Sequence, residues 1–197
     1  MPEITAAQVK ALREKTGLGM MTCKEALVAS DGDSEKAVEW LRKKGLDAAG
    51  KRMGRVTKEG AIGSYIHMNG RIGVLVELNC ESDFVARSED FQQLLKDLCM
   101  QVAATAPIAV SAENVDEKVV AKEREIYASQ VAGKPQAVVD KIVEGKLKKF
   151  FAEQCLVAQP FVKNPDMSVT DRIKGVIAKT GENITVRRFV RYQLGED

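Results

Sequence analysis

The residues of this sequence that could hold a metal ion or act as nucleophiles are few and scattered. A zinc site needs cysteine or histidine ligands at short spacing, and no Cys-x-x-Cys pair occurs. The pattern instead favours buried, reduced thiols in a cytoplasmic protein, and it predicts no metal site. The candidates are the single histidine, His67, and the four cysteines Cys23, Cys80, Cys99 and Cys155.

Motifs for phosphate binding and acid–base chemistry are missing too. Gly17-Leu18-Gly19 lacks the third glycine of a dinucleotide-binding loop, and it precedes Met20-Met21 instead of following a strand. No Gly-Lys-Ser or Gly-Lys-Thr ending of a P-loop occurs. His67 is expected near a hairpin turn without a paired nucleophile, and the carboxylates are spread over predicted helix surfaces. We therefore predict a protein that is not an enzyme and needs no cofactor.

Two short apolar features suggest binding to another molecule. Neighbouring residues on a helix point about 100° apart, so Met20 or Met21 faces away from the core unless the helix start is frayed with both half-buried. Asp83-Phe84 follows an apolar strand, where loops commonly carry function. The hydrophobic pattern by itself favours Phe84 in the core. An exposed Phe84 would leave unrealised about 1.5–3 kcal/mol that a partner could recover.

A basic stretch is the third feature. Residues 42–58 contain seven Lys and Arg and one Asp, a local charge of +6. Gly50 and Gly54 weaken any helix there. The stretch is predicted to be a solvated linker rather than a nucleic-acid site.

Composition places the chain among soluble globular proteins. It has 197 residues, 45% hydrophobic and 29% charged, with a net charge of +2. That balance argues against a general nucleic-acid coat, which needs a broad positive field. No apolar run reaches the roughly 18 residues of a membrane span, and the N-terminal residues do not have the pattern of a signal peptide.

Hydrophobic periodicity divides the chain into a helical unit (residues 1–45), a basic linker (46–58) and a main domain (59–197). Three helices are expected in the first unit, the third ending at Gly45. In the main domain, strands are expected at 61–68, at 72–78 (buried on both faces) and at 184–192. In the last strand one face is expected to carry Ile184, Val186, Val190 and Tyr192, which alternate with Thr185, Arg187, Phe189 and Arg191. Asn69-Gly70 predicts the turn between the first two strands.

Helices are expected to cover the sheet of the main domain. A wide apolar stripe runs from Phe91 to Val102. Residues 112–156 read as a helical hairpin joined near Gly133, with helices over 111–131 and from Lys134-Pro135 to 156, and a last helix runs from Ser168 to Gly181. The predicted fold class is α+β, with a three-helix domain followed by a small antiparallel three-stranded sheet packed with helices.

Four stretches resemble the bacterial elongation factor Ts family, in the family's order and over nearly the whole chain. They are Lys10 to Leu27, which contains Thr16-Gly17-Leu18-Gly19-Met20-Met21; Glu77 to Arg87, which contains Ser82-Asp83-Phe84-Val85-Ala86-Arg87; Gln159 to Val162; and Gly181 to Arg188. The resemblance implies a guanine nucleotide exchange factor for elongation factor Tu, the GTPase that carries aminoacyl-tRNA to the ribosome.

The family's partner-binding residues correspond to two groups here. The resemblance implies that the three-helix domain, similar to the ubiquitin-associated fold, contacts the nucleotide-binding domain of the GTPase through Leu12, Arg13, Met20 and Met21. It further implies that Phe84 is exposed and inserts between helices of the GTPase, while Ser82, Asp83, Phe84 and Val85 dislodge the bound Mg²⁺.

Some positions depart from the family pattern. Ser82 and Thr22 stand where many members have Thr and Asp; the serine keeps the hydroxyl, whereas Thr22 lacks the charge. The chain resembles short-form members, which pair as homodimers through the sheet. Some of these carry a bridging cysteine near the C-terminus, where Val190 stands here, so we expect a homodimer without that disulfide.

Two other classes of protein stay open. A module that binds RNA or ribosomes would use residues 42–58, and its binding would weaken steeply with salt. An enzyme built on one of the cysteines would need an abnormally acidic thiol.

Overall fold

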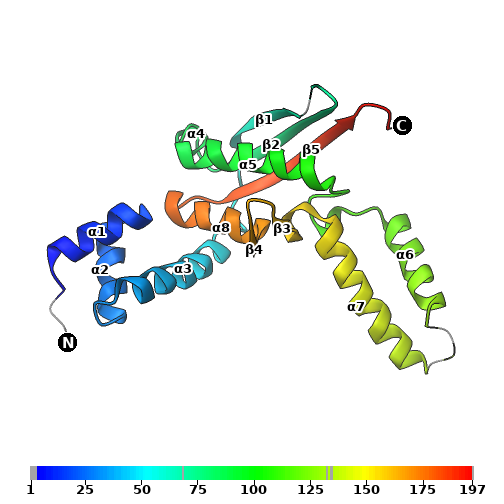
Figure 1. Cartoon of the computed structure of the whole chain (residues 1–197), viewed down its shortest axis with the longest axis horizontal. Helices are drawn as coiled ribbons and strands as arrows, with labels where there is room; N and C mark the ends of the chain where they lie inside the picture. Colours follow the sequence, from blue (N-terminus) through cyan, green and yellow to red (C-terminus); the bar gives the residue numbers. More distant parts are fainter. Residues whose placement is uncertain (1–3, 68, 132, 134, 197) are drawn as a thin grey trace.

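The computed structural model describes residues 4–67, 69–131, 133 and 135–196 (Figure 1). Predictions that concern residues 1–3, Met68, Lys134 and Asp197 lie outside this part of the chain. The helices are α1 (Ala6–Thr16), α2 (Met20–Ala29), α3 (Ser34–Gly50), α4 (Asp83–Ala86), α5 (Glu89–Thr105), α6 (Glu117–Ser129), α7 (Gln136–Gln154) and α8 (Val169–Thr180). The strands are β1 (Glu59–His67), β2 (Ile72–Cys80), β3 (Pro160–Phe161), β4 (Asn164–Ser168) and β5 (Ile184–Gln193).

The three predicted N-terminal helices are present and share one small core. Thr5 and Gln8 form a capping box at the start of α1, and Gly17 ends that helix with a φ of 70°. Asp33 caps α3 by accepting from two backbone amides. The buried residues of this unit are Val9, Leu12, Cys23, Ala26, Leu27, Ala37 and Leu41.

The prediction that the third helix ends at Gly45 is wrong, because α3 continues to Gly50. α3 packs against α8 here, and a Cβ on Gly45 would lie 3.1 Å from the Cβ of Ala178. Packing against α8 thus overrides the intrinsic cost of a helical glycine, about 1 kcal/mol relative to alanine. The first residues of the predicted linker are therefore helical, and α3 connects the three-helix unit to the main domain.

β1, β2 and β5 form an antiparallel sheet with β2 in the centre, which confirms the α+β fold class. Asn69 and Gly70 have φ values of 55° and 78° in the β1–β2 connection, as the predicted Asn-Gly turn requires. α5 packs on one face of the sheet, and α8 packs against α5 and β5 (Figure 1).

The prediction that β2 is buried on both faces is wrong. Val74, Val76 and Leu78 are buried in the core, but Leu75 on the opposite face is 46% exposed. α5 and α8 cover the sheet from one side only, so the outer side chains of all three strands remain accessible. We call this surface the open face; its apolar side chains are Ile62, Ile66, Leu75, Val190 and Tyr192.

A β-bulge in β5 changes which of its residues share a face. Between Val186 and Arg188 the strand carries one extra residue relative to β2, Arg187. Val186 packs against the core, whereas Val190 and Tyr192 lie on the open face. The predicted alternation placed all three on one face and is wrong, because a shift of one residue reverses every later side chain.

α6 and α7 lie side by side at the end of the molecule away from the three-helix unit (Figure 1). The helix predicted from Ser111 begins only at Glu117, because Ser111 and Asn114 form a separate capping box around a short 3₁₀ turn. The small β3–β4 sheet was not predicted. The residues that pack α6 against α7 are Val120, Tyr127, Val131, Val139, Val143 and Leu147.

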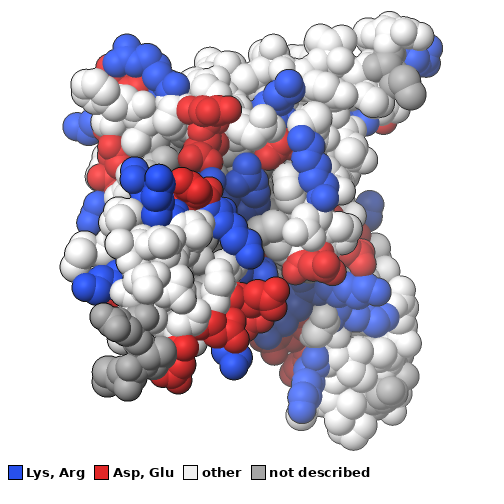
Figure 2. Space-filling model, turned by 60° about the vertical axis from the view of Figure 1, so that its left-hand side comes forward, with Lys and Arg blue, Asp and Glu red and all other residues white. Residues whose placement is uncertain are grey.

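The surface carries charges of both signs. On the face shown in Figure 2, Lys and Arg side chains are intermixed with Asp and Glu side chains. Within the described ranges, no helix combines the length and the apolar character that crossing a bilayer requires.

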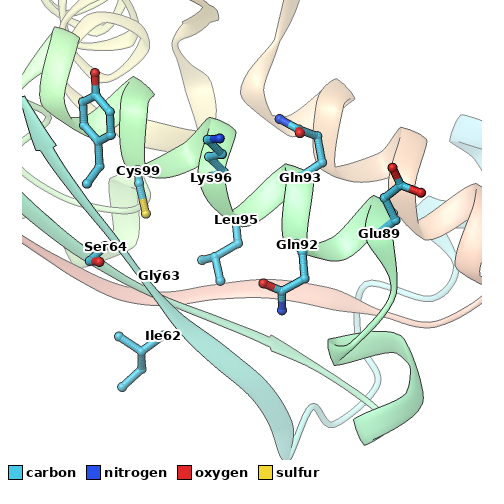
Figure 3. A pocket seen from close by; sticks show the side chains of 10 residues that line it. Ile62, Gly63, Ser64, Glu89, Gln92, Gln93, Leu95, Lys96 and Cys99 are labelled. Atoms are coloured by element: carbon cyan, nitrogen blue, oxygen red, sulfur yellow. The ribbon is translucent and has the colours of Figure 1, made fainter.

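Close packing of α5 on β1 depends on Gly63. A Cβ at this position would lie 2.6 Å from Leu95 Cγ and 3.1 Å from Cys99 Sγ (Figure 3). We expect Gly63→Ala to lower the free energy of unfolding by about 1–3 kcal/mol through overpacking, measured by denaturant titration. The control is Gly145→Ala in α7, where a Cβ meets nothing within 4 Å, and which should raise stability by about 0.4–1 kcal/mol. Equal stability of the two variants would contradict this packing.

Candidate partner-binding site

The segment Ser82–Arg87, predicted to be a loop, contains the one-turn helix α4 directly after β2. Ser82 caps this helix, and its hydroxyl accepts a hydrogen bond from the Val85 backbone N at 3.4 Å. Ala86 is buried, and Val85 packs partly against the core. One side of α4 is therefore anchored, and the other side faces solvent.

Phe84 occupies the solvent side of α4 and is 79% exposed. The hydrophobic pattern favoured a core position and was wrong, whereas the family resemblance implied exposure. Phe84 and Ala86 are two residues apart and point in nearly opposite directions on a helix, so a single turn buries only one of them. The Arg87 guanidinium lies 5.6 Å from the Phe84 ring centroid and forms an ion pair with Asp83.

Two side chains from outside α4 hold its ends. At the start, the carboxylate of Glu182 accepts hydrogen bonds from the Ser82 backbone N at 2.9 Å and from the Ser82 hydroxyl at 2.6 Å. At the end, Gln92 Nε2 donates to the Ala86 carbonyl at 2.7 Å. No sequence motif pointed to a role for Glu182 or Gln92. The one sequence signal for Glu182 was its place within a family-like stretch, Gly181 to Arg188.

The second predicted group lies at the junction of α1 and α2. Met20 and Met21 are 43% and 70% exposed, and Arg13 is exposed in the last turn of α1. Leu12 is different, since it is only 1% exposed and belongs to the core of the three-helix unit. The structure thus brings Arg13, Met20 and Met21 to the surface, while Leu12 lies in the core of the same unit.

All four cysteines are buried, and burial raises the thiol pKa of Cys80, Cys99 and Cys155. Burial, followed by the charge of Glu182, raises the pKa of Cys80 from 9.0 to about 11. Burial likewise raises the pKa of Cys99 to about 11 and that of Cys155 above its ordinary value. A raised thiol pKa lowers the fraction of reactive thiolate. In the part of the chain that the structure describes, no three His, Cys, Asp or Glu side chains are grouped to hold a metal ion.

A groove of about 440 Å³ lies between β1 and α5 (Figure 3). Ser64 and Tyr65 line it from the strand, and Glu89 and Lys96 from the helix. Glu89 is the one carboxylate and Cys99 the one thiol among its lining residues, and the groove has no histidine.

Comparison with known proteins extends the family resemblance to the whole chain. The sequence model described as "Elongation factor TS" matches residues 23–196. The chain is 56% identical over 196 residues to elongation factor Ts of Syntrophus aciditrophicus (strain SB), with 98% of each protein covered. It is 55% identical over 198 residues to that of Desulfosudis oleivorans, with 100% of each covered. To that of Moorella thermoacetica it is 58% identical over 195 residues, 98% of this chain and 96% of the relative.

Because the four cysteines are buried, we predict that they react slowly with thiol reagents in the native protein. We expect a thiol reagent near neutral pH to label the native protein slowly at all four cysteines, and to label the denatured protein quickly. The reason is that burial blocks access and, at Cys80, Cys99 and Cys155, the raised pKa keeps the thiol protonated. Native labelling of any one cysteine at the rate of a free thiol would contradict this and revive the cysteine-enzyme alternative.

Proposed function

The chain belongs to the elongation factor Ts family, and on that premise we propose that it promotes release of GDP from elongation factor Tu, so that GTP can bind during translation elongation. It would act as an exchange factor in the cytoplasm, by protein–protein contact, without covalent chemistry and without binding nucleic acid directly.

The observation that carries this proposal is the exposure of Phe84. It is the most exposed large hydrophobic side chain in the described ranges, and it lies on a helix that is held at both ends. Burying a phenylalanine contributes about 1.5–3 kcal/mol, which only a partner could supply here. We propose that Phe84 inserts between helices of the GTPase near its nucleotide.

The exchange mechanism follows from how a GTPase holds GDP. Oriented backbone amides, a lysine and Mg²⁺ hold the phosphates. A factor releases GDP when it binds better to the conformation in which these groups are displaced, and it need not touch the nucleotide. The segment Ser82–Val85, with the Asp83 carboxylate, would displace the Mg²⁺. The effect is reciprocal, since GDP weakens the factor by the same ratio as the factor weakens GDP.

A second contact would come from the three-helix unit. Met20 and Met21 offer exposed, adaptable apolar side chains, and Arg13 offers a charge beside them. Leu12 would contribute indirectly, by holding α1 in place under this surface. α4 and the α1–α2 junction lie toward the same end of the molecule in Figure 1, so one partner could meet both.

We also propose that two copies of the chain pair through the open face. Ile62, Ile66, Leu75 and Tyr192 are exposed apolar side chains on one sheet surface. Contiguous patches of this kind commonly mark an interface. Position 190, on the same face, is a valine, and all four cysteines are buried, so no disulfide would cross this interface.

The first test measures release of labelled GDP from elongation factor Tu. We expect Phe84→Ala to slow the accelerated release by about ten- to a hundredfold, because about 1.4 kcal/mol of lost binding corresponds to a factor of ten. Its thermal stability should be unchanged, since Phe84 is exposed. Val56→Ala is the matched control, because Val56 is 73% exposed outside the proposed contacts. If Phe84→Ala releases GDP as fast as wild type, insertion of Phe84 between helices of the GTPase is excluded as the cause of release.

The second test measures molar mass by light scattering. We expect a dimer of equal mass in reducing and oxidising buffer. Leu75→Lys should produce monomers, because it places a charge in the middle of the open face, whereas Ile126→Lys on α6 should remain dimeric. A monomeric wild-type protein would contradict pairing through the sheet.

A further inference from the structure

Glu182 lies in the turn between α8 and β5, 100 residues along the chain from Ser82. Its two carboxylate oxygens accept separate hydrogen bonds, Oε2 from the Ser82 backbone N and Oε1 from the Ser82 hydroxyl. Hydrogen bonds to a charged acceptor are roughly twice as strong as neutral ones, and two together fix orientation. The contact therefore fixes the residue from which α4 begins.

The turn that carries Glu182 is itself immobilised. Asn183 is fully buried, its backbone N donates to Glu81 Oε1 at 2.6 Å, and its side-chain Nδ2 donates to the Arg55 carbonyl at 2.7 Å. Gly181 ends α8 immediately before, with a φ of 79°. Because the turn is attached on both sides, Glu182 acts as a fixed point for Ser82.

Besides Glu182, short-range contacts hold the start of α4, since the Ser82 carbonyl accepts from Ala86 N at 3.2 Å and from Cys80 Sγ at 3.1 Å. A single turn is far too short to be stable alone. The hydrogen bond from Val85 N to the Ser82 hydroxyl is long, at 3.4 Å. Asp83 and Phe84 face solvent, so only Val85 and Ala86 contribute core contacts.

We infer that Glu182 is a positioning residue for Phe84: by holding Ser82 it orders α4 before the partner GTPase is met. The inference rests on the proposed exchange function. Ordering a binding element in advance removes that entropy cost from the binding step. Without Glu182, the encounter through Arg13, Met20 and Met21 persists, but less binding energy remains to displace the Mg²⁺ and phosphate-binding elements.

The test is a titration of elongation factor Tu·GDP with the full-length factor, which separates two quantities. The first is the maximal GDP release rate at saturating factor, and the second is the factor concentration that gives half of it. We expect Glu182→Ala to lower the maximal rate by about tenfold, the order expected for lost hydrogen bonds to a carboxylate. A purely structural defect would instead reduce the amount of folded factor, raising the half-saturating concentration and leaving the maximal rate unchanged.

Conservative variants sharpen the test. Glu182→Gln should retain most of the maximal rate, because its amide oxygen can accept from the Ser82 N and its amide nitrogen can donate to the Ser82 hydroxyl. Ser82→Ala combined with Glu182→Ala should lose less than the sum of the two single losses, because both remove the same contact. Glu144→Ala, an exposed glutamate on α7, should behave as wild type.

A wild-type maximal rate for Glu182→Ala would overturn the inference. Equal losses of the maximal rate in Glu182→Ala and Glu182→Gln would also overturn it, because the charge of Glu182, and not its hydrogen bonds to Ser82, would then support release. If wild-type factor releases GDP and Phe84→Ala does not, but Glu182→Ala reaches the wild-type maximal rate, this inference fails and the proposed function stands. If wild-type factor releases no GDP, the proposed function fails with it.

Discussion

The packing of α5 against one face of a three-stranded sheet is the interaction on which the rest of this structure depends. The apolar stripe of α5, from Phe91 to Val102, is buried against β1 and β2, and Gly63 in β1 permits the close approach of α5. No helix among the described residues covers the other sheet face, so its apolar side chains remain accessible. The same packing fixes where β2 ends and α5 begins, and α4 is the short connection between them.

In the proposed function, an exposed phenylalanine on an anchored helix supplies binding free energy to the site. Phe84 contributes nothing to the core, yet the helix that carries it is anchored through Ala86, Gln92 and Glu182. In the free protein the Phe84 ring is not buried, so its burial free energy is available to a partner. Because α4 is already ordered, less entropy is lost on binding. If Phe84 lay on a disordered segment, the partner would have to order that segment, and the entropy cost would reduce the binding free energy.

Distant parts of the chain meet around this support. The 181–183 turn contacts Ser82 and the end of the linker at Arg55, and α8 also packs against α3 of the three-helix unit. The two proposed contact surfaces, at Phe84 and at Met20-Met21, are therefore attached to the same helix and the turn that follows it. Their relative placement is thus a property of the fold and not of a flexible connector.

Local features of this protein were predictable from the sequence because their causes lie within a few residues. The capping boxes at Thr5 and Ser168, the Asn69-Gly70 turn and the stripe of α5 depend only on neighbouring side chains. Asp83-Phe84 was a binding candidate from its place after an apolar strand, but the hydrophobic pattern favoured Phe84 in the core, and only the family resemblance implied its exposure. Tertiary structure decided the continuation of α3 through Gly45, the bulge at Arg187, the exposure of Phe84 and the contact of Glu182 with Ser82. Each of these depends on contacts between elements that are far apart in the chain, and no local sequence pattern specifies such contacts.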